Sequence, residues 1–136
     1  MKTFTRVALM LAALAAPCSH AADDGVIAAL LKTYEGQGGS KFAAAKAEVM
    51  WTQPFIDVKS GDKRRCSACH SDDLRRQGKH VVTGKLIDPL AASANPKRLT
   101  DPEHIEKWFL RNCKWTLGRE CSPQEKGDFL VMIRSK

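Results

Sequence analysis

Two cysteines and a histidine at fixed spacing constrain this chain more than any other feature of its sequence. Cys66 and Cys69 are three residues apart, and His70 follows the second cysteine directly. Residues three apart lie about one helical turn apart, so the two thiols match the two vinyl groups on one porphyrin edge, and the adjacent imidazole reaches the iron. The motif therefore predicts one covalently attached haem c, bonded to Cys66 and Cys69, with His70 as an axial ligand.

Three other interpretations of the motif compete with haem attachment. A thioredoxin-like redox pair needs a βαβ setting, which the sequence lacks. A zinc knuckle needs a second ligand pair, for which Cys113 and Cys121 are available. A disulfide between Cys66 and Cys69 would be strained. Haem attachment is favoured because the chain also begins with the pattern of an export signal.

Residues 1–21 have the pattern of a secretory signal peptide. Two basic residues precede an unbroken apolar run over residues 7–16, and small residues follow it up to Ala21. The run is too short to span a membrane. We therefore expect cleavage after Ala21, loss of Cys18 with the signal, a single domain over residues 22–136, and a periplasmic location.

Basic residues gather around the cysteine motif. Residues 59–85 carry eight lysines and arginines against three acidic residues. The formal net charge of the whole chain is +7, and removal of Lys2 and Arg6 with the signal peptide lowers it to +5. The excess of five basic residues in this segment equals that remaining charge. The segment is suited either to steering an acidic partner towards the motif or only to solubility. Nucleic-acid binding is not expected after export, and no later segment resembles a membrane-inserting one.

Helical periodicity dominates the chain and predicts a small all-α domain with long loops. Four helices are expected outside the motif, over residues 24–35, 40–51, 100–112 and from 122 to near the end. Ser40 is the expected cap of the second helix, and Thr100 and Ser122 each open a capping-box pattern with proline in the first turn. Residues 57–65 form a charged loop, and residues 78–96 are expected to be irregular. A buried haem would supply the apolar centre that so small a core lacks.

The sequence offers no methionine at an obvious position for the second axial ligand of the haem iron. No methionine lies between His70 and Met132, and Met132 falls in the last helix, where core packing is its expected role. Met50 precedes the motif and lies within the second expected helix. His80 is expected in a solvated loop.

Asn112 falls in the middle of an apolar helix face. At about 100° per residue it lies between Trp108 and Phe109 on the face centred on Ile105, and His104 lies roughly 90° away from that face. A buried amide in this position is costly unless it has a partner. Two roles remain open at this point: a ligand of the haem iron, or a helix C-cap, which asparagine tolerates.

Five stretches carry a resemblance to a known family. They are CSACH (66–70), TGKLIDPLA (83–91), RLTDPEHIEKW (98–108), RNC (111–113) and GRECSPQEK (118–126). These stretches resemble the SHP (sphaeroides haem protein) family of oxygen-binding monohaem class I cytochromes c. The resemblance implies a class I cytochrome c fold around one haem, with His70 and Asn112 as axial ligands and a disulfide between Cys113 and Cys121.

The resemblance also implies a function and partners. The iron would bind O2, NO or CO after reduction, and electrons would come from a redox partner such as a diheme cytochrome c associated with a membrane cytochrome b. The hard amide oxygen of Asn112 favours Fe(III) over Fe(II), so we expect it to leave on reduction. A simple electron carrier with permanent Asn112 ligation, a gas sensor or scavenger, and a terminal reductase of O2 or a nitrogen oxide stay open as alternatives. His80 and Arg111 are candidates for an acid or base near the iron only by their position in the sequence.

Overall fold

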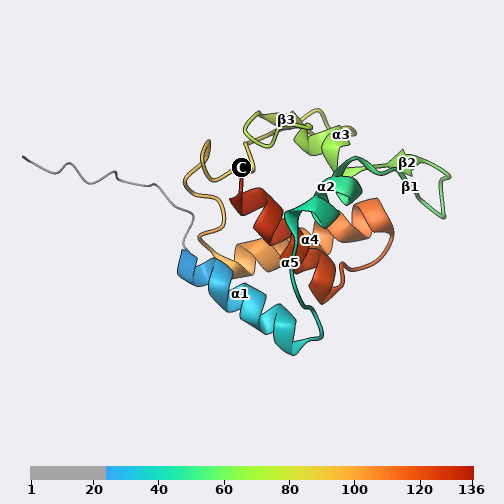
Figure 1. Cartoon of the computed structure of the whole chain (residues 1–136). Helices are drawn as coiled ribbons and strands as arrows, with labels where there is room; N and C mark the ends of the chain where they lie inside the picture. Colours follow the sequence, from blue (N-terminus) through green and yellow to red (C-terminus); the bar gives the residue numbers. More distant parts are fainter. Residues whose placement is uncertain (1–23) are drawn as a thin grey trace, which may run out of the picture.

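The computed structural model describes residues 24–136, and the predicted signal peptide lies outside this range. The described chain contains five helices, α1 (Asp24–Gly36), α2 (Ala44–Thr52), α3 (Cys66–His70), α4 (Pro102–Leu117) and α5 (Pro123–Arg134). Helix α5 packs against both α1 and α2, whereas α3 lies on the side of the molecule away from α1 (Figure 1). Over residues 24–136 no helix is long and apolar enough to cross a membrane.

Two clusters of buried apolar side chains hold the helices together. One joins α1 to α5 and includes Ile27, Tyr34 and Leu130. The other joins α2 to α5 and includes Trp51 and Met132. The helical spacing of these residues predicts the buried faces of α1 and α5. The architecture is the predicted small, single, helix-rich domain.

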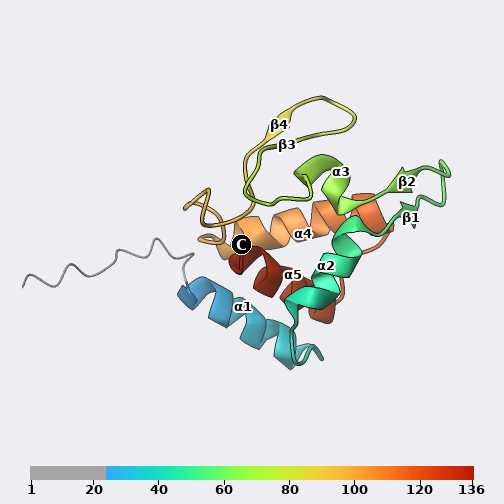
Figure 2. The same ribbon diagram turned by 45° about the horizontal axis from the view of Figure 1, so that its top comes forward.

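Two short antiparallel strand pairs form in loops that the sequence predicts to be charged or irregular. Strand β1 (Phe55–Ile56) pairs with β2 (Lys63–Arg64), and β3 (Gly78–Lys79) pairs with β4 (Leu86–Ile87). Each strand is two residues long, so no alternation of apolar and polar residues reveals it in the sequence. One pair precedes α3 in the chain and the other follows it. Figure 2 shows both hairpins beside α3, the helix that carries Cys66, Cys69 and His70 and is called the attachment helix below.

Helix α2 begins at Ala44 rather than at Ser40. Lys41 has a φ of 46°, in the left-handed region, which prevents a right-handed helix from including it. The N-terminal end of α2 is instead stabilised by another helix, because Asp128 of α5 accepts a hydrogen bond from the amide of Ala43 at 2.7 Å. The prediction of Ser40 as the cap was wrong because the capping group comes from a distant part of the chain.

Helix α4 both begins and ends later than the sequence predicts. Its N-cap is Asp101 rather than Thr100, because the Asp101 carboxylate accepts hydrogen bonds from two amides of the first turn at 3.0 and 3.1 Å. The helix continues past Asn112 to Leu117 and ends at Gly118, whose φ is 71°. Glycine adopts this left-handed conformation at little cost, which makes Gly118 the C-cap.

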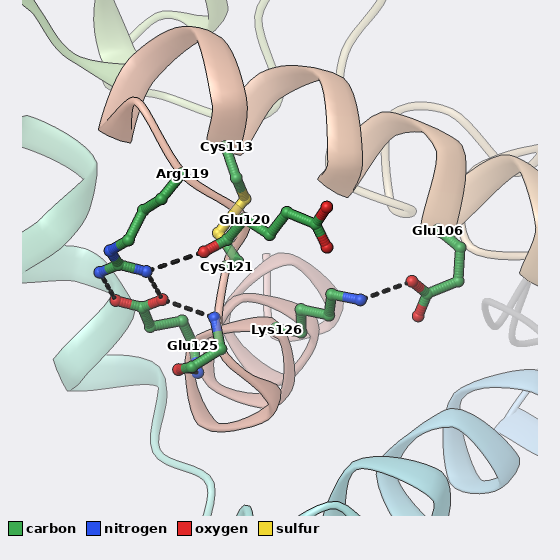
Figure 3. The surroundings of a disulfide bond; sticks show 8 residues. Glu106, Cys113, Arg119, Glu120, Cys121, Glu125 and Lys126 are labelled. Atoms are coloured by element: carbon green, nitrogen blue, oxygen red, sulfur yellow. Dashed lines mark hydrogen bonds and ion pairs between the residues drawn. A yellow bond between two sulfur atoms is a disulfide. The ribbon is translucent and has the colours of Figure 1, made fainter. Parts of the chain in front are cut away.

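A disulfide and an ion pair fix the turn between α4 and α5 (Figure 3). Cys113 and Cys121 are bonded, with an S–S distance of 1.96 Å, which is the pairing that the resemblance implies. The Arg119 guanidinium donates to both carboxylate oxygens of Glu125 at 2.8 and 2.7 Å and holds the pKa of that carboxyl below its ordinary value. Glu125 also exchanges hydrogen bonds with Ser122, which confirms the predicted capping box.

Candidate haem attachment site

The candidate attachment residues lie on one short helix. Cys66, Cys69 and His70 belong to α3, and both cysteines are free thiols, Cys66 half-buried and Cys69 buried. Burial raises the pKa of the Cys66 thiol to about 11. Because Cys113 and Cys121 are bonded to each other, the second ligand pair that a zinc knuckle needs is not available. Cys66 and Cys69 are not bonded to each other either, so both thiols can form thioethers.

His70 has the protonation state that a metal ligand needs. Burial lowers the pKa of its imidazole to about 4, with further lowering from the charges of Arg98 and His80. A neutral imidazole is the form that binds a metal. The ring centroid lies 5.7 Å from that of Trp51, whose Nε1 donates to the Ser71 carbonyl at 2.9 Å. Trp51 therefore packs beside the His70 ring, and its hydrogen bond to Ser71 fixes the end of α3.

The Nδ1 atom of His70 is buried without a hydrogen-bond partner in the described chain. Haem-bound histidines usually donate this nitrogen to a nearby carbonyl, and the loop of residues 87–90 is a candidate to supply one. The structure uses those carbonyls otherwise: Arg98 donates to the Pro89 carbonyl and to the Asp88 carbonyl, each at 2.9 Å. Two carbonyls of this loop therefore accept from Arg98, a residue that the sequence does not mark as their partner.

Gly78 lets the following hairpin lie directly against the attachment helix. A Cβ atom at this position would lie 2.1 Å from the Cys69 carbonyl oxygen and 3.0 Å from the His70 Cα. Real Cβ atoms do not approach backbone this closely, so only glycine fits here. The sequence marks Gly78 merely as the start of an irregular segment, because the contact is tertiary.

Asn112 lies inside α4 and is half-buried. Because the helix runs on to Leu117, the C-cap interpretation of Asn112 was wrong. Residues three and four positions further along lie on the same helix face. Thr116 is four positions further and buried, and the proximity of its side chain to the Cys66 thiol partly offsets the rise that burial causes in the pKa of that thiol. The face of α4 that carries Asn112 is therefore turned towards the attachment helix.

The other candidate ligands from the sequence lie elsewhere. Met132 is 1% exposed in the core, as predicted, and Met50 packs against the same cluster. His104 is exposed, and its Nε2 accepts a hydrogen bond from Nε1 of Trp108 on the same helix. His80 lies in the loop between β3 and β4, as expected, but it is half-buried rather than fully solvated. Its Nδ1 accepts from two amides of its own turn at 3.3 and 3.2 Å, and its ring lies 6.4 Å from that of Trp115.

Together these residues fit a covalently bound haem. Two free thiols stand three residues apart on one helix, beside a neutral, mostly buried imidazole. A second polar side chain, that of Asn112, comes from α4, whose last turn lies close to the first thiol through Thr116. Sequence reasoning missed Thr116, although its place four residues after Asn112 was a signal that could have found it.

Comparison with known proteins places the chain among haem proteins. A family described as a domain of unknown function, DUF1924, matches residues 37–133. Cytochrome c-type protein SHP of Cereibacter sphaeroides is 37% identical over 135 residues, covering 97% of this chain and 99% of SHP. Cytochrome c'' of Methylophilus methylotrophus is 42% identical over 74 residues, covering 54% of this chain and 51% of that protein.

Solved structures agree with these matches. Oxidised SHP, described as an oxygen-binding cytochrome c, superposes with a TM-score of 0.73 at 36% identity, covering 81% of this chain and 96% of that one. A solution structure of cytochrome c'' from Methylophilus methylotrophus, described in terms of haem-ligand detachment, gives a TM-score of 0.72 at 30% identity, covering 84% and 96%. Both likenesses extend over most of the two chains compared.

Proposed function

Because this chain belongs to the DUF1924 family and to the haem c proteins related to SHP, we propose that it is an electron-accepting cytochrome c whose iron opens on reduction. Cys66 and Cys69 attach the single haem, and His70 and Asn112 bind the ferric iron. With the haem bound, Asn112 would leave on reduction, and its face of the site would become available to O2, NO or CO. The placement of Asn112 carries this proposal: it is a polar side chain in the helix interior, on the face turned towards Cys66.

The chemistry of the two ligands explains the opening. The haem supplies an iron that changes between two oxidation states. The amide oxygen of Asn112 is a hard, weak donor that favours Fe(III), whereas the imidazole of His70 suits both states. A methionine ligand would hold the ferrous iron, but Met132 is buried in the core between α2 and α5. Support also comes from the relatives, one described as oxygen-binding and one in terms of haem-ligand detachment.

Absorption spectra in both oxidation states test the opening. We expect the ferric protein to be six-coordinate without added ligand, and the reduced protein to bind CO with a large shift of its main absorption band. A reduced protein that keeps its six-coordinate spectrum under CO would contradict the proposal. The protein would then be a simple electron carrier with permanent Asn112 ligation.

Ligand binding and catalysis are separated by a different measurement. A terminal reductase turns over steadily when it is supplied with a reductant and O2 or NO. A sensor or scavenger binds one equivalent and stops. Arg111 is exposed, with its guanidinium 5.2 Å from the centre of the Trp108 ring, and His80 contacts its own turn and Trp115. Neither contact assigns an acid or base role, so turnover has to be measured directly.

We also propose an acidic redox partner, such as a diheme cytochrome c linked to a membrane cytochrome b. Seven of the eight basic residues between 59 and 85 are exposed, and the eighth, Arg64, is paired with Asp57. The hairpin that carries Lys79 and Lys85 starts at Gly78, against the attachment helix. A positive surface beside the haem edge raises the rate of encounter with a negative partner.

The salt dependence of electron transfer checks this surface. With an acidic donor protein, the bimolecular rate should fall steeply as ionic strength rises, because salt screens long-range attraction. The variant Lys79→Glu should slow the reaction several-fold at low salt. Lys32→Glu is the matched control, because Lys32 is exposed on α1, on the far side of the molecule (Figure 2). Equal rates in both variants would exclude the surface as the docking site.

Export to the periplasm, with cleavage after Ala21, stays a prediction and agrees with covalent haem attachment. The N-terminal residue of the purified protein checks it directly: Ala22 is expected. An intact N-terminus in a protein that carries haem would contradict the proposed processing.

A further inference from the structure

One arginine outside α4 holds the turn of that helix next to Asn112. Arg64 stands in β2, shortly before Cys66, and its side chain is 20% exposed. Its Nη1 donates to the Trp115 carbonyl at 2.8 Å, and its guanidinium lies 4.9 Å from the centre of the Trp115 ring. Trp115 belongs to the last turn of α4, where helix carbonyls have no partner within the helix. Arg64 therefore donates a hydrogen bond to an otherwise unpaired carbonyl at the C-terminal end of α4, where a positive charge interacts favourably with the helix dipole.

Arg64 is itself fixed by the hairpin that precedes the attachment helix. Its guanidinium pairs with Asp57 at 2.8 Å, and the Asp57 side chain is only 13% exposed. Asp57 in turn accepts hydrogen bonds from the amides of Lys59 and Ser60 at 3.1 and 2.9 Å. The arginine is thus held at one end by the β1–β2 loop and at the other by the end of α4.

The geometry of the helix connects this contact to Asn112. In an α-helix the carbonyl of residue 112 accepts from the amide of residue 116, so residues 112–116 form one turn. The Trp115 carbonyl, to which Arg64 donates, belongs to this turn, and Asn112 is its first residue. The side chain of Thr116, in the same turn, lies close to the Cys66 thiol. The disulfide of Cys113 holds the helix to the turn before α5 and does not bind it to the attachment helix. Arg64 and Thr116 are therefore two polar contacts that hold this turn near the segment that attaches the haem, beside the packing of Cys66 against the cluster that contains Cys113.

We propose that Arg64 is a positioning residue, which keeps Asn112 at the ferric iron by holding the last turn of α4 against the segment that attaches the haem. The inference rests on the proposed ligation by Asn112. Arg64 acts through Trp115 and the helix backbone. Without it the last turn frays more often, and Asn112 spends more time away from the iron.

Cyanide binding to the ferric holoprotein measures this directly, because cyanide competes with Asn112 for the iron. We expect Arg64→Gln to lower the cyanide Kd about tenfold, the factor that one lost charge-assisted hydrogen bond gives. CO binding to the reduced protein should stay unchanged, because Asn112 has already left. Asp57→Asn, which keeps the loop hydrogen bonds but removes the ion pair, should shift the cyanide Kd in the same direction by a smaller factor. Arg65→Gln is the matched control: it removes the same charge from the neighbouring, exposed residue.

The outcomes separate this inference from the proposal on which it rests. Unchanged cyanide affinity in Arg64→Gln, together with tighter binding in Asn112→Ala, would overturn the role of Arg64 and leave the ligation by Asn112 standing. Equal shifts in ferric cyanide and ferrous CO affinity would show a general loosening of the structure and would also overturn it. If Arg64→Gln does not fold, the comparison of Asp57→Asn with Arg65→Gln decides: equal cyanide affinities reject the role. Unchanged cyanide affinity in Asn112→Ala would reject the ligation itself.

Discussion

Alanine in place of Asn112 should open the ferric iron to external ligands. The iron should lose its second protein ligand, and cyanide should bind about 100-fold more tightly, because an internal ligand that holds the iron for about 99% of the time lowers the apparent affinity by that factor. The reduced protein should bind CO as before. Ferric absorption spectra and cyanide titrations measure the first effect, and CO titrations of the reduced protein measure the second.

Methionine at the same position is the informative counterpart. A thioether binds both oxidation states well, so Asn112→Met should keep the reduced iron six-coordinate and weaken CO binding. The two variants thus act on opposite oxidation states. A ferric spectrum and a cyanide affinity that stay unchanged in Asn112→Ala would show that this side chain is not a ligand.

The fold was largely predictable because local patterns determine most of it. The helical spacing of Ile27, Leu30 and Tyr34 gives α1 and its buried face, and the capping box at Ser122 gives the start of α5. The errors occur where a distant residue decides the outcome. Asp128 stabilises the start of α2 in place of the predicted Ser40, and it lies in another helix.

The residues of the candidate site also divide into those that a local sequence pattern predicts and those that only contacts between distant elements reveal. Cys66, Cys69 and His70 form a local motif, and Asn112 is marked by its polar side chain on an apolar face. The structure strengthens the case for Asn112 by extending α4 past it, which removes the C-cap role. Arg64 and Gly78 were not predictable, because they are ordinary in the sequence and acquire their roles only through contacts between separate elements. Thr116 was marked only by its place four residues after Asn112.

Gly78→Ala should be the most damaging small substitution near the site. Its Cβ would meet the Cys69 carbonyl oxygen at 2.1 Å, and the neighbouring atoms also belong to backbone, so no side chain can move aside. Either the β3–β4 hairpin or the attachment helix has to shift, at a cost of about 3 kcal/mol, the upper part of the range for overpacked sites. Denaturant unfolding of the holoprotein measures the loss of stability, and the ratio of haem to protein measures the effect on attachment.

Gly36→Ala is the control for this substitution, because it adds the same methyl group where no other atom lies within 4 Å. Gly36 is the last residue of α1, and alanine there should be neutral or slightly stabilising. A difference of a few kcal/mol between the two variants shows that the hairpin and the attachment helix are packed backbone to backbone. Equal stabilities would mean that the hairpin can move away from α3 freely, and the basic residues that it carries would then have no fixed place beside the haem edge.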